Sequence, residues 1–180
     1  MSEGTTRPEK YDPVARALHW GMAILFIPQF AAAAAHWAFE REHPLRQALW
    51  PYHVDLGLTL FALIILRGVW GLITLMRRPH RHAGAVGIAA TTGHFVLYGL
   101  MILVPLLRIL SAAGGKRGLD YFGVTILPAK ETENAWLKSL SEWHGELGWV
   151  LLAVIIGHIA MALIWHNQIK KDGALKRMIG

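Results

Sequence analysis

Two histidines, His144 and His158, lie fourteen residues apart in one apolar stretch near the C-terminal end of the sequence. In an α-helix, fourteen steps of ~100° and ~1.5 Å place both imidazoles on nearly the same face, about 21 Å apart along the axis. A histidine inside a membrane is energetically costly and usually functional, and a neutral imidazole is a common metal ligand. We therefore expect two stacked sites, each completed by a ligand from another helix.

The composition is that of an integral membrane protein. Of the 180 residues, 54% are hydrophobic and 17% are charged, and the apolar residues are gathered into long blocks. The chain has no cysteine, which excludes disulfides, thiolate metal sites, iron–sulfur clusters and covalently attached haem. Lysine and arginine fall mostly between and beyond the apolar blocks, as membrane topology requires, so the net charge of +6 does not indicate nucleic-acid binding.

Four apolar segments are long enough to cross a bilayer, because each is near the ~20 residues that a spanning helix needs. Asp12 is a good N-cap and Pro13 suits the first helical position, so the first segment has a clear start. The stretch from Ser111 to Trp143 is expected to be a long external loop. The sequence therefore predicts an all-α fold, a single domain over residues 1–180, built as a transmembrane four-helix bundle with spans at about 14–39, 49–76, 83–110 and 144–166.

The distribution of lysine and arginine predicts the orientation of the bundle. The N-terminal arm, the loop around residues 77–81 and the C-terminal tail share one side and carry ten of these residues, whereas the other side carries six. The positive-inside rule therefore places both termini in the cytoplasm. One alternative concerns the first segment, whose basic arm, apolar run and alanines 31–35 also resemble a signal peptide with its cleavage site.

Depth along the helices supplies a partner for each of the two histidines. In the predicted orientation the fourth segment runs inward, so His144 is outer and His158 is inner. His19 lies six residues after Pro13, ~9 Å from the cytoplasmic end of the first segment, at a depth similar to that of His158. His53 lies near the outer start of the second segment, at the depth of His144. The predicted pairs are therefore His19–His158 and His53–His144.

Two neutral imidazoles that face each other between helices suit bis-histidine haem iron, and helix bundles commonly build cofactor sites in this way. His94, in the cytoplasmic half of the third segment, is a competing ligand, a polar contact near a quinone or haem, or a core histidine. Four glycines near the histidines would let a flat macrocycle approach the backbone, although small residues also serve helix packing: Gly57, Gly145, Gly148 and Gly157. The histidines at segment ends are expected to be interfacial or solvated: His36, His43, His80, His82 and His166.

Two arginines repeat the same spacing. Arg67 lies fourteen residues after His53, and Arg108 lies fourteen residues after His94. A buried arginine needs an anionic partner, and a haem propionate would serve for either residue. The alternative is that each side chain extends to lipid headgroups, which suits Arg108 better because it lies at the outer end of the third segment.

Five sequence motifs, taken in order along the chain, resemble a known family. Together they are similar to the bacterial cytochrome b561 family, which is related to the cytochrome b subunits of nickel–iron hydrogenases and formate dehydrogenases. The resemblance covers nearly the whole chain, and the length and the FGVT–LP loop favour the stand-alone branch. The motifs are RALHW (16–20), YHVDLG (52–57), LRGVWG (66–71), YFGVTILP (121–128) and EWHGELGWVLLAVIIGH (142–158).

The resemblance implies a diheme b-type cytochrome of the bacterial inner membrane, with two non-covalent haem b groups. In that family the ligands come from the first, second and fourth helices, and the matching positions here are His19, His53, His144 and His158. Members pass electrons between quinone and a second redox partner, and some oxidise superoxide at the periplasmic face while reducing ubiquinone. The expected function is therefore electron transfer between a periplasmic-side donor, with superoxide as one candidate, and membrane quinone.

Two other functions remain open at this point. One is a cytochrome b subunit that docks a periplasmic hydrogenase or dehydrogenase. The other, of a different class, is a histidine-lined transition-metal transporter, which would tend to carry more acidic intramembrane residues than Asp55. A superoxide donor would gain from a positive outer surface. The outer loop supports this only in part, because Lys116, Arg117, Lys130 and Lys138 are balanced by Asp120, Glu131, Glu133 and Glu142.

Overall fold

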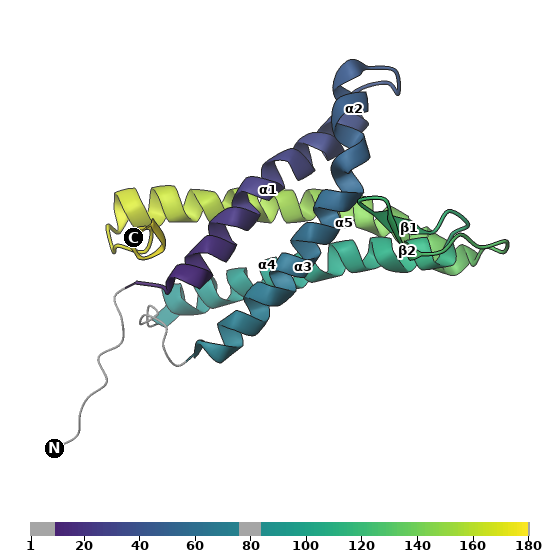
Figure 1. Ribbon diagram of the computed structural model, residues 1–180. Coiled ribbons are helices and arrows are strands. Elements are labelled where there is room, and N and C mark those ends of the chain that lie inside the picture. Colours follow the sequence, from purple (N-terminus) through teal and green to yellow (C-terminus); the bar gives the residue numbers. More distant parts are fainter. Residues whose placement is uncertain (1–9, 76–83, 180) are drawn as a thin grey trace.

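The computed structural model describes residues 10–75 and 84–179 of the chain. Helices dominate these residues, which confirms the predicted all-α class (Figure 1). Within the described ranges, four helical stretches are long and apolar enough to cross a membrane: Pro13–Ala38, Pro44–Ile73, Gly87–Gly114 and Ala135–Ile169.

The first span is the helix α1, Pro13–Ala38. Asp12 caps it, because its carboxylate accepts a hydrogen bond from the backbone N–H of Ala15 at 2.9 Å. Pro28 lies inside the helix, where it removes one backbone hydrogen bond, as membrane helices tolerate. The capped start at Asp12 is the one that the sequence predicts.

The second span has three parts. The short helix α2 (Pro44–Leu49) and the 3-10 turn η1 (Trp50–Tyr52) lead into α3 (His53–Ile73). A proline stands in the first turn of both α2 and η1, where its missing N–H has no helical partner to lose. The helical stretch therefore begins before the predicted span start at residue 49, and the predicted end at residue 76 lies outside the described residues.

The third and fourth spans extend further than their apolar segments. The helix α4 covers Gly84–Gly114, and α5 covers Ala135–Ala160 before continuing as the π-helix η3, Met161–Ile169. The side chain of Asn134 caps α5 by accepting a hydrogen bond from the N–H of Leu137 at 3.1 Å. The helix α5 therefore begins before the predicted span start at residue 144. The predicted loop over 111–143 is too long at both ends, because α4 continues to Gly114 and α5 already begins at Ala135.

A β-hairpin occupies the connection between α4 and α5, and the sequence did not predict it. Strand β1 (Leu119–Tyr121) pairs antiparallel with β2 (Val124–Leu127). The two residues between them, Phe122 and Gly123, have φ of 46° and 80°. Positive φ at both central positions is what the two-residue type I′ turn requires, and glycine adopts it without strain.

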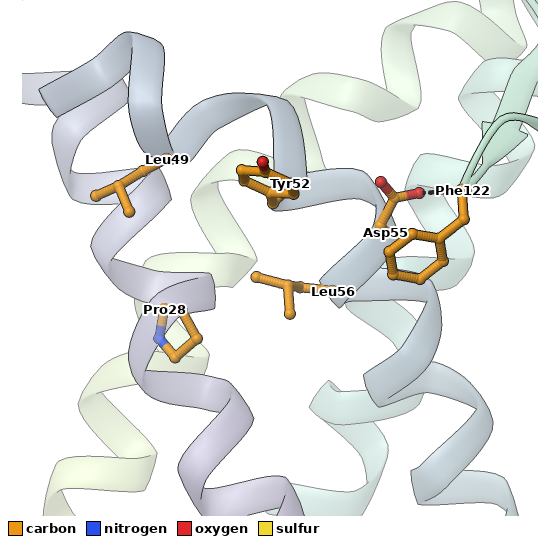
Figure 2. Close-up of a pocket in the computed structure, with 6 residues that line it drawn as sticks. All are labelled: Pro28, Leu49, Tyr52, Asp55, Leu56 and Phe122. Carbon is orange, nitrogen blue, oxygen red and sulfur yellow. Dashed lines mark hydrogen bonds between the residues drawn. The ribbon is translucent and has the colours of Figure 1, made fainter. Parts of the chain in front are cut away.

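Contacts with α3 hold this hairpin in place. The Asp55 carboxylate accepts a hydrogen bond from the backbone N–H of Phe122 at 2.7 Å, and the hydroxyls of Thr59 and Tyr121 hydrogen-bond at 3.1 Å. Figure 2 shows the Asp55 contact beside a partly open apolar hollow, which residues of α1, α2, η1, α3 and the hairpin line. The hollow has a volume of about 220 Å³. Its lining residues are Pro28, Leu49, Tyr52, Asp55, Leu56 and Phe122.

The long helices pack as two pairs. Helix α4 lies along α5, α1 lies along α3, and α3 also contacts α4 (Figure 1). By contrast, α1 and α5 make few direct contacts. Side chains from all four helices form one buried cluster: Met22, Leu60, Ile64, Leu97, Met101, Val104 and Leu151.

The two ends of the described chain meet at one end of the bundle, opposite the hairpin (Figure 1). The N–H of Tyr11 donates to the carbonyl of Arg177 at 3.2 Å, and the indole N–H of Trp70 donates to Asp12 at 2.9 Å. Burial acts to raise the pKa of Asp12, but hydrogen bonds from Ala15 and Trp70 outweigh it, so the pKa lies below its ordinary value. The N- and C-terminal ends of the described chain lie at the same end of the bundle, as expected when the chain crosses a membrane an even number of times.

Candidate functional site

Helix α5 carries both histidines with which the sequence analysis began. His144 and His158 lie in the continuous helix Ala135–Ala160 and are both half-buried. The helix begins nine residues before His144, so this side chain stands well inside the helix rather than at its start. The expected helical spacing between the two side chains therefore applies without interruption.

Each histidine of α5 faces a histidine of another helix. His144 faces His53 at the start of α3, with the ring centroids 6.2 Å apart and the ring planes at 90°. His158 faces His19 on α1, with the centroids 6.3 Å apart and the planes at 76°. We call His53 and His144, near the hairpin, the outer pair, and His19 and His158, near the chain ends, the inner pair. The structure thus brings together the partners that the depth argument selects.

The spacing within the pairs fits a metal held between two imidazoles. Such a metal lies about 2 Å from each ring nitrogen, and each nitrogen lies ~1.1 Å from its ring centroid, so the centroids stand roughly 6.2 Å apart. Both observed separations, 6.2 and 6.3 Å, match this value. Edge-to-face ring pairs also occur at centroid separations of about 4.5–7 Å, so this spacing agrees with a ligated atom between the rings and also with direct ring contact.

The ring of His144 is held by a backbone carbonyl of α4. Its Nδ1 lies 2.8 Å from the carbonyl oxygen of Val104, which can only accept a hydrogen bond. Nδ1 therefore carries the proton, and Nε2 keeps its lone pair. Metal-binding histidines are usually oriented by such a hydrogen bond through their other nitrogen.

The ring of His53 has two close neighbours that the sequence analysis missed. Its Nε2 lies 3.4 Å from Nε2 of Gln29 on α1, and the Trp50 ring stacks on it with centroids 4.8 Å apart. The ring of His36 in turn stacks on Trp50, with centroids 3.7 Å apart. A signal for Gln29 exists in the sequence, because it is the only amide side chain in the apolar run of α1.

The inner pair has a different surrounding. The Trp20 ring meets His19 edge-on at a centroid distance of 5.3 Å, and the His94 ring meets His158 edge-on at 5.3 Å. Nδ1 of His94 lies 2.6 Å from the carbonyl oxygen of Ala90, one turn earlier on α4. His94 therefore lies beside the inner pair, on the exposed side of α4.

The two arginines lie at different levels of the bundle. Arg67 is near enough to His19 and His158 to interact with both electrostatically, and its guanidinium lies 5.6 Å from the centroid of the Tyr98 ring. Arg108 interacts in the same way with both histidines of the outer pair. Each site therefore has one half-buried cation beside it. The expected propionate contacts stay a prediction.

The glycines near the histidines differ in their surroundings. A Cβ on Gly57 would lie 3.2 Å from Nε2 of Gln29, so this position accommodates the glutamine side chain. A Cβ on Gly145, Gly148 or Gly157 would meet no atom within 4 Å in the described part of the chain. Close helix packing therefore does not account for these three glycines, and the prediction that they admit a flat macrocycle stays open.

The histidines outside the pairs have varied surroundings. His43 caps α2, because its Nδ1 accepts a hydrogen bond from the N–H of Leu45 at 3.2 Å. His166, which the sequence predicts to be interfacial or solvated, has a side chain that is only 13% exposed, and its Nδ1 lies 2.7 Å from the Asp172 carboxylate. His36 is half-buried against Trp50. The two remaining ones, His80 and His82, lie outside the described residues.

The donor set restricts what the pairs can bind. Among residues 10–75 and 84–179, no group of three or more histidine, cysteine, aspartate or glutamate side chains is placed to hold a metal ion. A metal between two imidazoles needs further ligands from outside this set, and the porphyrin of haem would provide four nitrogens.

Four membrane-length helices that present paired imidazoles to one another define a class of helical membrane proteins that includes the b-type cytochromes. The sequence pattern of one family, the prokaryotic cytochrome b561, matches residues 10–180. The chain belongs to this family, and the resemblance found from the motifs is confirmed. It is therefore a multi-pass membrane b-type cytochrome, which binds haem b and serves electron transfer.

A curated relative matches almost the full length of the chain. The chain is 26% identical over 178 residues to "Cytochrome b561 homolog 2" of Escherichia coli (strain K12), and the match covers 98% of this chain and 94% of the relative. Because both chains are covered nearly completely, the likeness extends over all four spans rather than over one motif.

Proposed function

We propose that the chain holds two haem b groups, one between His53 and His144 and one between His19 and His158. We further propose that it carries electrons between a periplasmic-side donor and membrane quinone, with ubiquinone as the expected acceptor or donor. The observation that carries this proposal is the near-equal spacing of the two ring pairs, 6.2 and 6.3 Å, on a shared helix. Bound haem iron would supply the one-electron chemistry, while these residues ligate, orient and space it.

The distance between the two levels supports transfer across the membrane. His144 and His158 are fourteen residues apart on α5, which corresponds to about 21 Å along the helix axis. The hydrocarbon core of a bilayer is ~30 Å thick, so the two levels together cover most of it. With lysine and arginine concentrated on the side of the termini, we place both termini in the cytoplasm and the outer pair at the periplasmic side of the bacterial inner membrane.

We assign His19, rather than His94, as the partner of His158. The His94 ring is 5.3 Å from the His158 ring, which is shorter than the ~6.2 Å that a shared metal requires, whereas the 6.3 Å of His19 matches. His94 then serves as a polar contact beside the inner haem or quinone. Arg67 and Arg108 are proposed to pair with haem propionates at the inner and outer levels, respectively.

Superoxide is a candidate donor because of the charge around the outer pair. Two of the basic loop residues are engaged, since Lys138 forms an ion pair with Glu133 at 2.9 Å and Lys130 donates to the carbonyl of Ala113 at 2.7 Å. Arg117 and Arg108, in contrast, lie near enough to interact electrostatically with each other. Such like-charge clustering would attract an anion to the outer level.

A second candidate function is docking of a periplasmic hydrogenase or dehydrogenase, and one observation favours it. The hairpin end of the molecule exposes large apolar side chains, namely Phe122, Val124, Ile126 and Trp136. Exposed apolar groups of this kind suit a protein partner or the membrane interface. Co-purification of a periplasmic redox protein with the full chain would favour this function over a stand-alone carrier.

The experiment that tests the proposal is a reduced-minus-oxidised visible spectrum with haem quantitation on the purified protein. We expect a b-type spectrum with two haems per chain. One haem per chain would contradict the two-site proposal, and the absence of a b-type spectrum would contradict the haem assignment itself. Rapid superoxide consumption by the isolated protein in the presence of ubiquinone would identify the donor, whereas a rate equal to that of free haem would exclude it.

A further inference from the structure

Gln29 is a polar side chain in a membrane-spanning helix, and it points at the outer pair. Its Nε2 lies 3.4 Å from Nε2 of His53. Its amide oxygen Oε1 is buried and has no hydrogen-bond partner in the described residues, and the same holds for Nδ1 of His53. A buried amide oxygen without a hydrogen-bond partner is destabilising, so an amide at this position needs a compensating role.

The neighbouring helix is shaped to receive the Gln29 amide. A Cβ on Gly57 of α3 would stand 3.2 Å from Gln29 Nε2, so any larger residue would displace the amide. Gly57 lies one helical turn after His53. The amide is therefore enclosed between the histidine ring and the open position that glycine leaves.

The other ring of the outer pair shows what such a neighbour does. His144 donates its Nδ1–H to the carbonyl of Val104 at 2.8 Å, which leaves Nε2 with a free lone pair. In the inner pair, the rings of His19 and His158 have no hydrogen-bond partner within residues 10–75 and 84–179. A carbonyl acceptor for His53 would therefore give both rings of the outer pair a hydrogen bond, through Nδ1 in His144 and through Nε2 in His53, and would distinguish this pair from the inner pair.

The Gln29 amide can supply this acceptor by a half-turn about its terminal bond. Oxygen and nitrogen then exchange places, and the oxygen takes the position 3.4 Å from the histidine nitrogen. Oε1 of Gln29 then accepts a hydrogen bond from Nε2–H of His53, so both groups are satisfied. Nδ1 of His53 keeps its lone pair. This arrangement leaves one nitrogen of His53 available to a metal.

We propose that Gln29 is a positioning residue of the outer haem site. Its amide oxygen accepts the Nε2–H of His53 and fixes the ring so that Nδ1 ligates iron. The proposal rests on haem binding at the outer pair, as proposed above. An acceptor on the far nitrogen raises the basicity of the ligand, which favours oxidised iron and lowers the midpoint potential. Because the contact exists only at His53, the effect belongs to the outer haem.

The test compares three variants of the full-length protein purified with its haem. Gln29→Leu removes the acceptor, Gln29→Glu keeps an oxygen acceptor, and Gly57→Ala pushes the amide by a few tenths of an ångström from the opposite side. Gln47→Leu, the same chemical change on the exposed face of α2, is the matched control. The readouts are the midpoint potential of each haem, the haem content, and the g values of the oxidised haems in low-temperature electron paramagnetic resonance, which depend on the orientation of the ligand rings.

We expect Gln29→Leu to raise the midpoint potential of one haem, to alter one of the two resonance signals, and to weaken haem retention at that site by about 10–100-fold. Gly57→Ala should shift the same haem in the same direction by less, and Gln29→Glu should retain both haems without raising the potential. If Gln29→Leu does not fold, the Gly57→Ala result decides the question.

Two results would overturn the proposal while leaving two-haem binding intact. One is a Gln29→Leu protein with both potentials and both signals equal to those of Gln47→Leu. The other is an equal shift of both haems, which would show a general structural effect. A wild-type protein without a second haem would instead contradict the proposed function on which this inference rests.

Discussion

The outer and inner pairs have the same spacing and different surroundings. Their ring centroids are 6.2 and 6.3 Å apart, respectively, but only the outer pair has hydrogen-bonding neighbours on its rings within the described residues. The inner pair has aromatic edges and a third histidine beside it instead. The helices therefore determine the distance within a pair, whereas residues around the rings distinguish one site from the other. The predictions below test whether the two sites behave as separate units.

The largest expected effect follows from removing one histidine of α5 at a time. His144→Ala should lose the outer haem alone and His158→Ala the inner haem alone, because each ring belongs to one pair. Haem quantitation and redox titration of the purified variants measure this, and we expect one haem per chain in each. His43→Ala, outside both pairs, is the control and should keep two. Loss of both haems from either single variant would show that the sites are not separate.

The arginines should distinguish the two sites by potential. A positive charge beside a haem favours the reduced state, so Arg67→Gln should lower the inner potential and Arg108→Gln the outer one. A half-buried charge ~10 Å from the iron contributes on the order of 1 to 2 kcal/mol, or roughly 40 to 90 mV for one electron. Redox titration measures both potentials. Replacement of either arginine by lysine keeps the positive charge and should leave the midpoint potential close to that of the wild type. An equal shift of both haem potentials in one variant would contradict the assignment of Arg67 to the inner site and Arg108 to the outer site.

Asp12 should affect the inner end of the bundle more than the outer end. Its carboxylate caps α1 and accepts a hydrogen bond from Trp70, so Asp12→Ala should destabilise the protein by about 1 kcal/mol and release the inner haem first on heating. The pKa of Asp12 is lowered on folding, so its contribution is present above the ordinary value of 3.8 and is lost as the pH falls through the folded value.

The pH dependence of Asp12 has a matched control. Asp12→Asn keeps a capping oxygen without a titrating group, so its thermal unfolding should change less between about pH 5 and pH 3 than that of the wild type. Absorbance of the haem band during heating follows the release. If thermal unfolding of the two proteins depends equally on pH, carboxyl groups other than Asp12 determine the pH dependence of stability.

The smallest effect is expected at His94. If His19 is the ligand of His158, then His94→Phe keeps both haems and shifts only the inner potential slightly, because an edge contact with the ligand ring is altered. Haem quantitation and redox titration of the purified His94→Phe variant measure this. A variant with one haem would instead identify His94 as the ligand, and His19→Phe would then keep two.

Sequence reasoning could place the histidines because their depth depends only on residue spacing along regular helices. His19, His53, His144 and His158 are fixed in this way once the helices are known to cross a membrane. The contacts of Gln29 and Trp50 depend on how neighbouring helices are rotated about their axes, which spacing does not determine. The carbonyl of Val104 belongs to the backbone and has no sequence signal. The start of α5 at Ala135 was missed because that turn is polar and lies outside the apolar segment.

Helix α5 contributes one histidine to each pair, and it follows α1, α3 and α4 in the chain. During synthesis the first three spans can enter the membrane with His19 and His53 in place, yet neither of these has its partner until α5 is inserted. Under the proposed function, both haem sites would therefore be completed together, by the last of the four spans. A nascent chain with only the earlier spans would hold neither proposed histidine pair, so we expect haem loading to follow the insertion of α5.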